Sequence, residues 1–551
     1  MSRFNLIDEP WIPVRLLDQT QPDGKRAELG IKDTLLRAKE IAIIEDPSPL
    51  VVASLHRFLL AVLYRALEGP TDIDQAKGWF KAGLPAEKIE GYLERWEDRF
   101  WLFEGKNPFF QTPGFEPKKW NAWTILAAEH NANNGKVLFD HIDVTQPGIV
   151  SAAAAVRWLL AAQTFAFTGN SELGYASFSP SANAVMAIPI GRNLEDTLLL
   201  CLVDQNRLVT KEDKPFWEME PDSPDRLKQG IARKVVGHAQ LYTWPSRTIR
   251  LRVSNEGVLE VAFAAGVRVA DAAGTDRNAT DKKPDDSKKK SKPVAFTDPM
   301  AAYHIDKDTG KQPRRFSERG LWRDFDSLLP DAERLAPAVI EHAAALTRFA
   351  RERFPQAVMV LGQANNKAKI EYWRMERHAL PASLVGNASA RSEIHQLLKD
   401  AEQSGSALEA ALRDWAKLII TKGDRDLHPD KWAKGKWVPG DVSRAIGKMS
   451  PDAPPSPALG YWSRLEAAFH DTLHHYTLER DPDAIRLDWL KTVRAALRDV
   501  WDQHAASVST GDAWAIRALV RAEGAIGKQL KVLSDEIQKY ECHLNPQEET
   551  A

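Results

Sequence analysis

The sequence predicts an α+β fold in two parts: a large irregular mixed α/β domain over residues 1–380, followed by a C-terminal four-helix bundle over residues 381–551. Two observations support this prediction. Short strand-like and helical segments are mixed up to about residue 380, without a regular βαβ order. Beyond Pro381, four segments carry apolar residues at the i, i+3/i+4 spacing of helices that pack on one face. Four such helices imply a bundle.

The composition bounds the function. At 551 residues the chain is too long for one core, and 43% hydrophobic with 27% charged residues is typical of a soluble globular protein. The formal net charge of −2 excludes a uniformly basic nucleic-acid coat, so any such contact must come from local patches. Cys201 and Cys542 are too few for a disulfide scaffold or a cysteine zinc site. With an N-terminus that lacks a signal-peptide pattern, this indicates a cytoplasmic protein.

In the first part, three segments have readable local patterns. Phe4–Val14 is expected to be extended, because its two prolines disfavour helix. The apolar run Leu50–Leu67 follows a proline-rich start and is expected to be helical. Glu87–Phe103 is expected to form another helix, since its large apolar residues recur at 3–4 residue spacing.

The second part contains the four helices. Their apolar stripes are Leu408, Leu412, Trp415 and Ile419; Trp462, Leu465, Phe469, Leu473 and Tyr476; Trp489, Val493, Leu497 and Val500; and Ile516, Leu519, Ile526, Leu530, Leu533 and Ile537. Each stripe is expected to face the core of the bundle.

The stretch Val358–His378 predicts a β-hairpin with a basic return strand. Gly362–Asn366 supplies turn residues that tolerate positive φ, and the cations and aromatics that follow are Lys367, Lys369, Arg374, Arg377, Tyr372 and Trp373. A stiff hairpin of this kind suits a phosphate backbone or a groove. Composition alone leaves open an ordinary surface hairpin with a solvated basic face.

Thr168–Ser177 and Asn131–Phe139 are candidate contact loops. In the first, Gly169 and Gly174 have the glycine spacing of a phosphate-binding P-loop, but the lysine and hydroxyl residue that the motif needs are replaced by Tyr175 and Ala176. ATP hydrolysis is therefore not expected there, although backbone N–H groups of such a loop can approach a nucleic-acid backbone.

The insertion Asp271–Pro293 is nearly devoid of large apolar residues and is expected to be mobile. Its function is either that of a solvated linker or that of a lysine arm that closes on a phosphate backbone. A third basic stretch, Lys417–Lys436, mixes cations with Trp432. Three such patches in a chain of near-zero net charge favour nucleic-acid binding.

Catalytic motifs were tested against the same sequence. His470, Asp471 and His474 lie on one predicted helix, with the two histidines at i, i+4, which makes a metal-dependent nuclease or phosphohydrolase the alternative function. Exposed helix polarity explains these residues more simply. There is no Gly-x-Ser-x-Gly elbow, and neither cysteine lies in a nucleophile motif. The sequence therefore predicts no catalytic residue, no metal site and no cofactor.

Phe4–Val14 closely resembles the opening of the CasA family, the large subunit of Cascade, the type I-E CRISPR surveillance complex. The resemblance extends through Asn107–Thr112, the loop at Gly169, Gly362–His378 and the helical C-terminus, so it covers essentially the whole chain in order. It implies a non-catalytic subunit that reads the PAM, the short DNA motif beside the target, and wedges the duplex open to start R-loop formation, while guide RNA reads the sequence. The implied partners are the other Cascade subunits, the 5′ handle of the guide RNA, double-stranded target DNA and a recruited helicase–nuclease, with no membrane.

The resemblance also assigns residues. The wedge at the hairpin tip matches Asn365, Asn366, Lys367 and Ala368; the PAM-proximal glycine loop matches Gly169, Asn170 and Ser171; the lysine finger falls among Lys288, Lys289, Lys290 and Lys292; and the guide-handle docking loop has Phe139 at its tip. Lys367 stands where the family has a glutamine, so it adds charge. A cysteine-rich zinc motif of some members is absent, and no structural zinc is expected.

Overall fold

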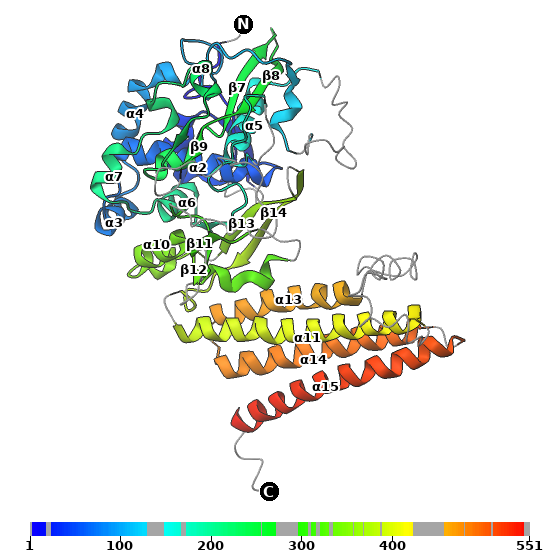
Figure 1. Cartoon of the computed structure of the whole chain (residues 1–551). Coiled ribbons are helices and arrows are strands. Elements are labelled where there is room, and N and C mark those ends of the chain that lie inside the picture. Colours follow the sequence, from blue (N-terminus) through cyan, green and yellow to red (C-terminus); the bar gives the residue numbers. More distant parts are fainter. Residues whose placement is uncertain are drawn as a thin grey trace. The chain divides into compact units, whose positions relative to one another are not determined.

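The computed structural model describes residues 3–17, 24–128, 130, 148–166, 172–254, 256–270, 296–306, 310–315, 320–329, 334–355, 357–366, 369–385, 388–421, 457–478, 480–508 and 511–544. The chain forms two compact units. The first comprises Met1–Leu321 and Ser327–Gly386, and the second comprises Trp322–Asp326 and Asn387–Ala551. The first mixes strands and helices and the second is helical (Figure 1), which confirms the predicted α+β class with a helical C-terminal part. Whether each unit folds independently is a separate property, so the predicted domain division at residue 380 stays a prediction.

The described strands of the first unit form small sheets. Their orders are β2-β1-β3, with β1 Ile12–Leu16, β2 Lys25–Leu29 and β3 Ile41–Ile44; β4-β8-β7, with β4 Asn121–Ala122, β7 Arg247–Val253 and β8 Val258–Ala265; β11-β10-β12, with β10 Tyr303–Asp306, β11 Gly310–Pro313 and β12 Arg334–Leu335; β14-β13-β5, with β5 Met186–Ile190, β13 Ala357–Asn366 and β14 Lys369–Ala379; and the parallel pair β6 Ala232–Arg233 with β9 Arg268–Val269.

The helices of the first unit are α1 Ile31–Leu36, α2 Pro49–Leu67, α3 Ile73–Ala82, α4 Ala86–Arg95, α5 Ala152–Thr164, α6 Leu194–Cys201, α7 Arg207–Glu212, α8 Pro224–Lys228, α9 His238–Tyr242 and α10 Ala338–Thr347, with short 3-10 turns that include Glu97–Arg99, Trp123–Leu126 and Phe216–Glu218. Among these helices, α4, α5, α6 and α9 pack against the long buried helix α2. Every residue of α2 except Arg65 is buried, and the Ser48 side chain caps its start by accepting from the Val51 N–H. α2 is long and apolar enough to cross a membrane, but 94% of its apolar window is buried inside the protein, as expected for a core helix.

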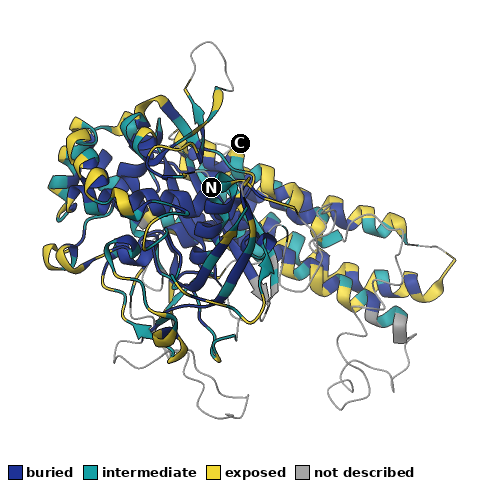
Figure 2. Ribbon diagram, turned by 90° about the horizontal axis from the view of Figure 1, so that it is seen from above, coloured by how far each residue is buried: buried dark blue, intermediate teal, exposed yellow. Residues whose placement is uncertain are grey.

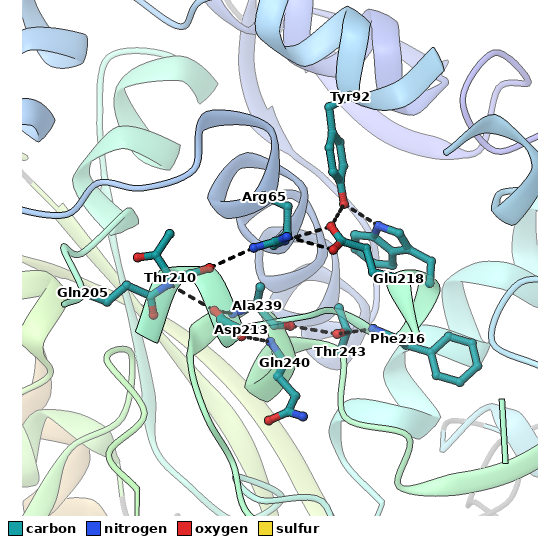
Figure 3. A network of polar contacts seen from close by, with 11 residues as sticks. Arg65, Tyr92, Gln205, Thr210, Asp213, Phe216, Glu218, Ala239, Gln240 and Thr243 are labelled. Atoms are coloured by element: carbon teal, nitrogen blue, oxygen red, sulfur yellow. Dashed lines mark hydrogen bonds and ion pairs between the residues drawn. The ribbon is translucent and has the colours of Figure 1, made fainter. Parts of the chain in front are cut away.

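A polar network fixes α2 to the segment 205–243 (Figure 3). The Arg65 guanidinium makes a two-pronged contact with the Glu218 carboxylate at 2.8 Å on each side, and the Tyr92 hydroxyl donates to the same carboxylate at 2.8 Å. The Asp213 carboxylate accepts from the backbone N–H groups of Ala239 and Gln240 at the start of α9. Because both buried carboxylates are hydrogen-bonded, this segment has a defined position against the core.

Of the local predictions for the first unit, one is confirmed and two are wrong in their extent. Leu50–Leu67 is helical, as predicted, and Trp11 is completely buried. The segment Phe4–Val14, predicted to be extended throughout, is a strand only from Ile12, because residues 6–8 form a turn and residues 9–10 a bend. The helix predicted over Glu87–Phe103 is too long. The backbone leaves the helical region at Trp96, where φ is −109° and ψ is 11°, and a 3-10 turn replaces the next helical turn.

The second unit contains the four predicted helices: α11 Ala388–Thr421, α13 Pro457–Thr477, α14 Pro482–Ser507 and α15 Ala513–Leu544. In Figure 2 the long helices of the second unit carry both buried and exposed residues along their length, as expected for helices that pack on one face. The apolar stripe predicted for the start of α15 is wrong: Ile516 is 40% exposed, and Ala515, Ala518 and Ala522 are buried instead. Small alanines let a helix approach its neighbours closely, and only from Ile526 onward does the packed face of α15 carry large side chains.

A short segment from before the boundary completes this unit. Trp322 and Phe325 lie against the Phe469 ring on α13, with centroid distances of 5.3 and 5.7 Å. The Arg323 guanidinium lies 3.4 Å from the centroid of the Trp462 ring and pairs with Glu402 through both of its oxygens. These contacts make Trp322–Asp326 part of the helical unit rather than of the unit that precedes and follows it in the chain.

Candidate nucleic-acid interface

The predicted hairpin is confirmed as β13 and β14, but the predicted turn at Gly362–Asn366 is wrong, because these residues are paired within β13, opposite residues 369–374 of β14. The strands pair antiparallel from Ala357 with Ala379 to Asn366 with Lys369, and the register shifts between Ala364 and Asn365. Strand β5 pairs with β13 only as far as Leu361, so the hairpin extends beyond the end of β5 as two strands alone. Asn365 and Asn366 are the last residues of β13. Lys367 and Ala368 lie outside the described residues, and the wedge assignment stays a prediction.

The positive charge of the return strand β14 is partly neutralised by ion pairing. The Arg374 guanidinium pairs with Glu376 at 3.2 Å and lies 5.7 Å from the Tyr372 ring. Glu376 also accepts from the Leu321 backbone N–H at 3.1 Å. Arg374 is therefore partly neutralised by its own strand, whereas Arg377 is exposed.

The hairpin is tied to the start of the glycine loop. The Gln363 side chain, completely buried on β13, donates from Nε2 to the Phe165 carbonyl at 2.8 Å. Phe165 is the C-cap residue of α5 and precedes Gly169 by four positions. Gly169, Asn170 and Ser171 themselves lie outside the described residues. The structure thus brings the base of one predicted DNA-contacting segment against the strand that leads to another.

Both ends of the glycine-loop segment are held. On one side, the Ser179 N–H donates to the Ala166 carbonyl at 2.8 Å. On the other, the buried Arg247 guanidinium donates to the Ser177 carbonyl at 2.8 Å, while the Gln163 side chain exchanges two hydrogen bonds with the Arg247 backbone. Burial lowers the pKa of Arg247 to about 10, so it remains charged at neutral pH. Local sequence patterns carried no signal for this role of Arg247.

The described residues on either side of the basic insertion Asp271–Pro293 belong to one hydrophobic cluster, which also includes a residue of the glycine loop. Val269, two positions before Asp271, is a buried member of this cluster together with Trp244. Phe296, three positions after Pro293, and Leu173, two positions after Ser171, pack against them. The candidate finger residues Lys288, Lys289, Lys290 and Lys292 lie outside the described residues, as does the third basic stretch beyond Thr421 up to Lys436.

A tryptophan holds both ends of the segment that contains Phe139. The Trp123 indole N–H donates to the Gly148 carbonyl at 3.2 Å, and its ring stacks on Trp158 with a centroid distance of 5.0 Å and an interplanar angle of 2°. The His130 ring lies edge-on to both indoles, at 5.6 and 5.5 Å. Residues 131–147, with Phe139, lie outside the described residues. The described residues on either side of this segment, His130 and Gly148, both contact the Trp123 side chain.

Helix α5 connects these two anchor points. Its first turn follows Gly148 and its last residue precedes the Phe165 carbonyl, and at 1.5 Å per residue its 13 residues span about 20 Å. The predicted guide-docking segment and the predicted glycine loop therefore leave opposite ends of one rigid element.

Comparisons with known proteins decide the family. Residues 5–500 match the family described as CRISPR-associated protein Cse1. A CRISPR-associated protein CasA/Cse1 of Thermus thermophilus is 32% identical over 547 residues, which are 98% of this chain and 99% of the relative. The chain belongs to the CRISPR-associated Cse1 family.

Solved structures agree with this assignment. A crystal structure of CasA from Thermus thermophilus has a TM-score of 0.78 at 30% identity, covering 96% of this chain and 100% of that one. Cse1 from Acidimicrobium ferrooxidans, at 22% identity, has a TM-score of 0.70 and covers 98% of this chain and 99% of its own. A chain of a structure described as a CRISPR RNA-guided surveillance complex has a TM-score of 0.65 at 20% identity, with 96% and 100% covered, and shares the fold.

The metal-dependent alternative gains no support from this Cse1 chain. His470 on α13 is half-buried, whereas Asp471 and His474 are exposed. Over the ranges that the structure describes, no three His, Cys, Asp or Glu side chains come together in a way that could hold a metal ion. Asp471 and His474 are polar residues on the exposed side of α13.

Proposed function

We propose that this chain is the large, non-catalytic subunit of a type I-E Cascade complex in the cytoplasm, and that it recognises the PAM in double-stranded DNA and wedges the duplex open. Family membership and the shared fold with a chain of an RNA-guided surveillance complex support the first part. One observation carries the second: the hydrogen bond from Gln363 to the Phe165 carbonyl joins the hairpin to the base of the glycine loop.

The arrangement suits a division of labour between protein and guide RNA. The glycine loop contacts the PAM, while Asn366 and Lys367 at the hairpin tip separate the adjoining base pairs. Unstacking costs a few kcal/mol per step, which wedge and phosphate contacts offset. Guide RNA then reads the sequence by base pairing, and the Phe139 loop holds the subunit on the guide's 5′ handle.

The wedge is tested with assembled complexes that carry Asn366→Ala or Lys367→Ala. We expect weaker binding of PAM duplexes and a smaller ratio of PAM to non-PAM affinity, since both groups act where the first base pairs open. Lys77→Ala, which removes a partly exposed lysine paired with Asp74, is the matched charge control. PAM discrimination that is unchanged in both tip variants would overturn the wedge assignment.

Lys367 gives the tip a charge in place of a neutral amide. Each phosphate that a cation neutralises steepens the salt dependence of binding, with a slope in log affinity of about −0.9 per contact on duplex DNA. We therefore expect Lys367→Gln to make duplex binding less salt-dependent by about one such contact. The lysine finger is located by four single lysine-to-alanine variants at Lys288, Lys289, Lys290 and Lys292 in the same titration. Finger and wedge contacts both precede R-loop formation, after which the bundle helps recruit the helicase–nuclease.

A further inference from the structure

The carbonyl group of Phe165, at the C-terminus of α5, accepts a hydrogen bond from a distant side chain. The final carbonyls of a helix accept no hydrogen bond from within the helix and need a donor from outside. The Phe165 carbonyl accepts from the Gln363 amide, at 2.8 Å, from a strand 198 positions away in the chain. Figure 1 shows α5 and the β13–β14 hairpin as separate elements of the first unit, so this bond is a tertiary link.

The hydrogen bond between Gln363 and the Phe165 carbonyl lies between the two segments that the proposed function assigns to DNA contact, the hairpin tip and the glycine loop. Gln363 is two positions beyond Leu361, where β5 stops covering β13, and three positions before Asn366. At about 3.3 Å per residue, the strand places the end of β13 about 10 Å further on. The Phe165 carbonyl is four positions from Gly169. The bond therefore joins the wedge strand to the end of α5, four positions before Gly169 in the sequence.

Stability alone does not explain a glutamine at this position. Gln363 is completely buried, and within the described part of the chain its Oε1 has no hydrogen-bond partner. A buried acceptor without a partner is unfavourable, and a methionine of the same length would avoid that cost. What methionine cannot supply is the directional N–H that fixes the Phe165 carbonyl.

We propose that Gln363 is a positioning residue that fixes the wedge strand relative to the PAM-proximal glycine loop, so that PAM contact and strand opening fall on adjoining base pairs. This inference rests on the proposed function. It concerns a different step from the wedge contact itself, because Gln363 is buried and does not touch DNA.

The test uses assembled complexes carrying Gln363→Met. Binding is measured to a fully paired PAM duplex and to the same target with the first base pairs unpaired in advance, together with docking of the subunit on the guide complex. Gln111→Met is the matched control, since Gln111 is also a buried glutamine with long-range bonds, to the Leu102 carbonyl at 2.6 Å and the Leu251 N–H at 2.8 Å.

Loss of one hydrogen bond predicts about a fivefold weaker affinity of Gln363→Met for the paired duplex, with the pre-opened duplex and guide docking within about twofold of the unmodified protein. Gln111→Met is expected to lower thermal stability without this difference between the two duplexes. Gln363→Asn keeps an amide but is one methylene shorter, so it should show the same pattern and also covers the case in which the methionine variant folds poorly.

Equal losses on the paired and pre-opened duplexes, or no loss on either, would overturn the positioning role. The tip variants Asn366→Ala and Lys367→Ala separate this result from a failure of the proposed function. If both tip variants keep full PAM discrimination, the proposed function fails and the inference fails with it. If either tip variant loses discrimination while Gln363→Met binds the paired and pre-opened duplexes with equal losses or none, only the inference fails.

Discussion

Arg57 and Asp298 form a buried ion pair in which guanidinium Nη1 lies 2.6 Å from carboxylate Oδ2, with the two residues 1% and 0% exposed. The Ser181 hydroxyl donates to the same carboxylate oxygen at 2.6 Å, and the Arg57 guanidinium lies 4.3 Å from the Tyr242 ring centroid. Asp298 lies five positions after Pro293, the last residue of the basic insertion. The pair therefore fixes the chain to the core helix α2 shortly after the insertion.

Asp298→Asn should destabilise the protein by about 3–5 kcal/mol, because it leaves the Arg57 charge buried without a counter-charge. The double variant Arg57→Met with Asp298→Asn should be less affected than the sum of its single changes. Urea unfolding of the single and double variants measures the coupling. Asp225→Asn, which breaks an exposed pair with Lys228, is the control and should cost less than about 1 kcal/mol. Equal costs for the buried and exposed pairs would contradict this account.

Stability should also depend on the buried imidazole of His56. Burial lowers the pKa of His56 to about 4, against an unfolded value of 6.5, and its Nδ1 lies 2.8 Å from the Val52 carbonyl. Since the folded pKa is the lower one, the unfolded chain binds the proton first. The contribution of His56 is fully present above pH 6.5 and is lost as the pH falls to about 4, by up to about 1.4 kcal/mol per pH unit.

Comparison with His56→Gln isolates this effect. Other buried groups act in the opposite sense, such as Asp213, whose pKa is raised by burial. Unfolding free energies of both proteins between about pH 4.5 and 7.5 should differ in slope by the contribution of one histidine. Identical slopes would show that His56 does not titrate on unfolding in this range.

Gly405 on α11 provides the space for Trp462. An added Cβ there would lie 2.2 Å from the Trp462 ring, so Gly405→Ala should destabilise the helical unit by about 1–3 kcal/mol through overpacking. Gly527 on α15 has nothing within 4 Å of an added Cβ, so Gly527→Ala should instead stabilise by about 0.5–1 kcal/mol. Thermal unfolding of the two glycine variants gives opposite shifts if this packing is right, and shifts of the same sign if it is not.

Trp123 should matter for docking on the guide complex. Trp123→Phe removes the N–H that binds the Gly148 carbonyl and weakens the stack on Trp158, so both ends of the Phe139 segment loosen. We expect a several-fold lower affinity for the guide complex, consistent with one lost hydrogen bond. Trp101→Phe, at a half-buried tryptophan elsewhere in the first unit, is the control.

A pull-down or interferometry titration with the assembled guide complex measures this affinity. Phe139→Ala should show a larger loss than Trp123→Phe, and combining the two should add little, because the tryptophan acts through the segment that Phe139 occupies. Additive losses would indicate that Trp123 contributes through stability instead.

Local sequence patterns were enough to predict α2, the existence of the β13–β14 hairpin and the four long helices of the second unit. The helices α11, α13, α14 and α15 lie where the apolar spacing placed them, because the helix period is set by the backbone and is readable in a short window. The N-terminal segment was sufficient for the family resemblance, which the comparisons confirm.

Which side chains act together depended on the tertiary structure alone. Ala515, Ala518 and Ala522 replace Ile516 on the packed face of α15. The segment Trp322–Asp326 belongs to the helical unit although the residues on both sides of it belong to the first unit. The Gln363 side chain binds the Phe165 carbonyl, 198 positions away in the chain. Each depends on a partner far away in the chain. A local pattern reports the period of a segment but not the surface that it packs against, and the free energy of burying a side chain is set by that surface.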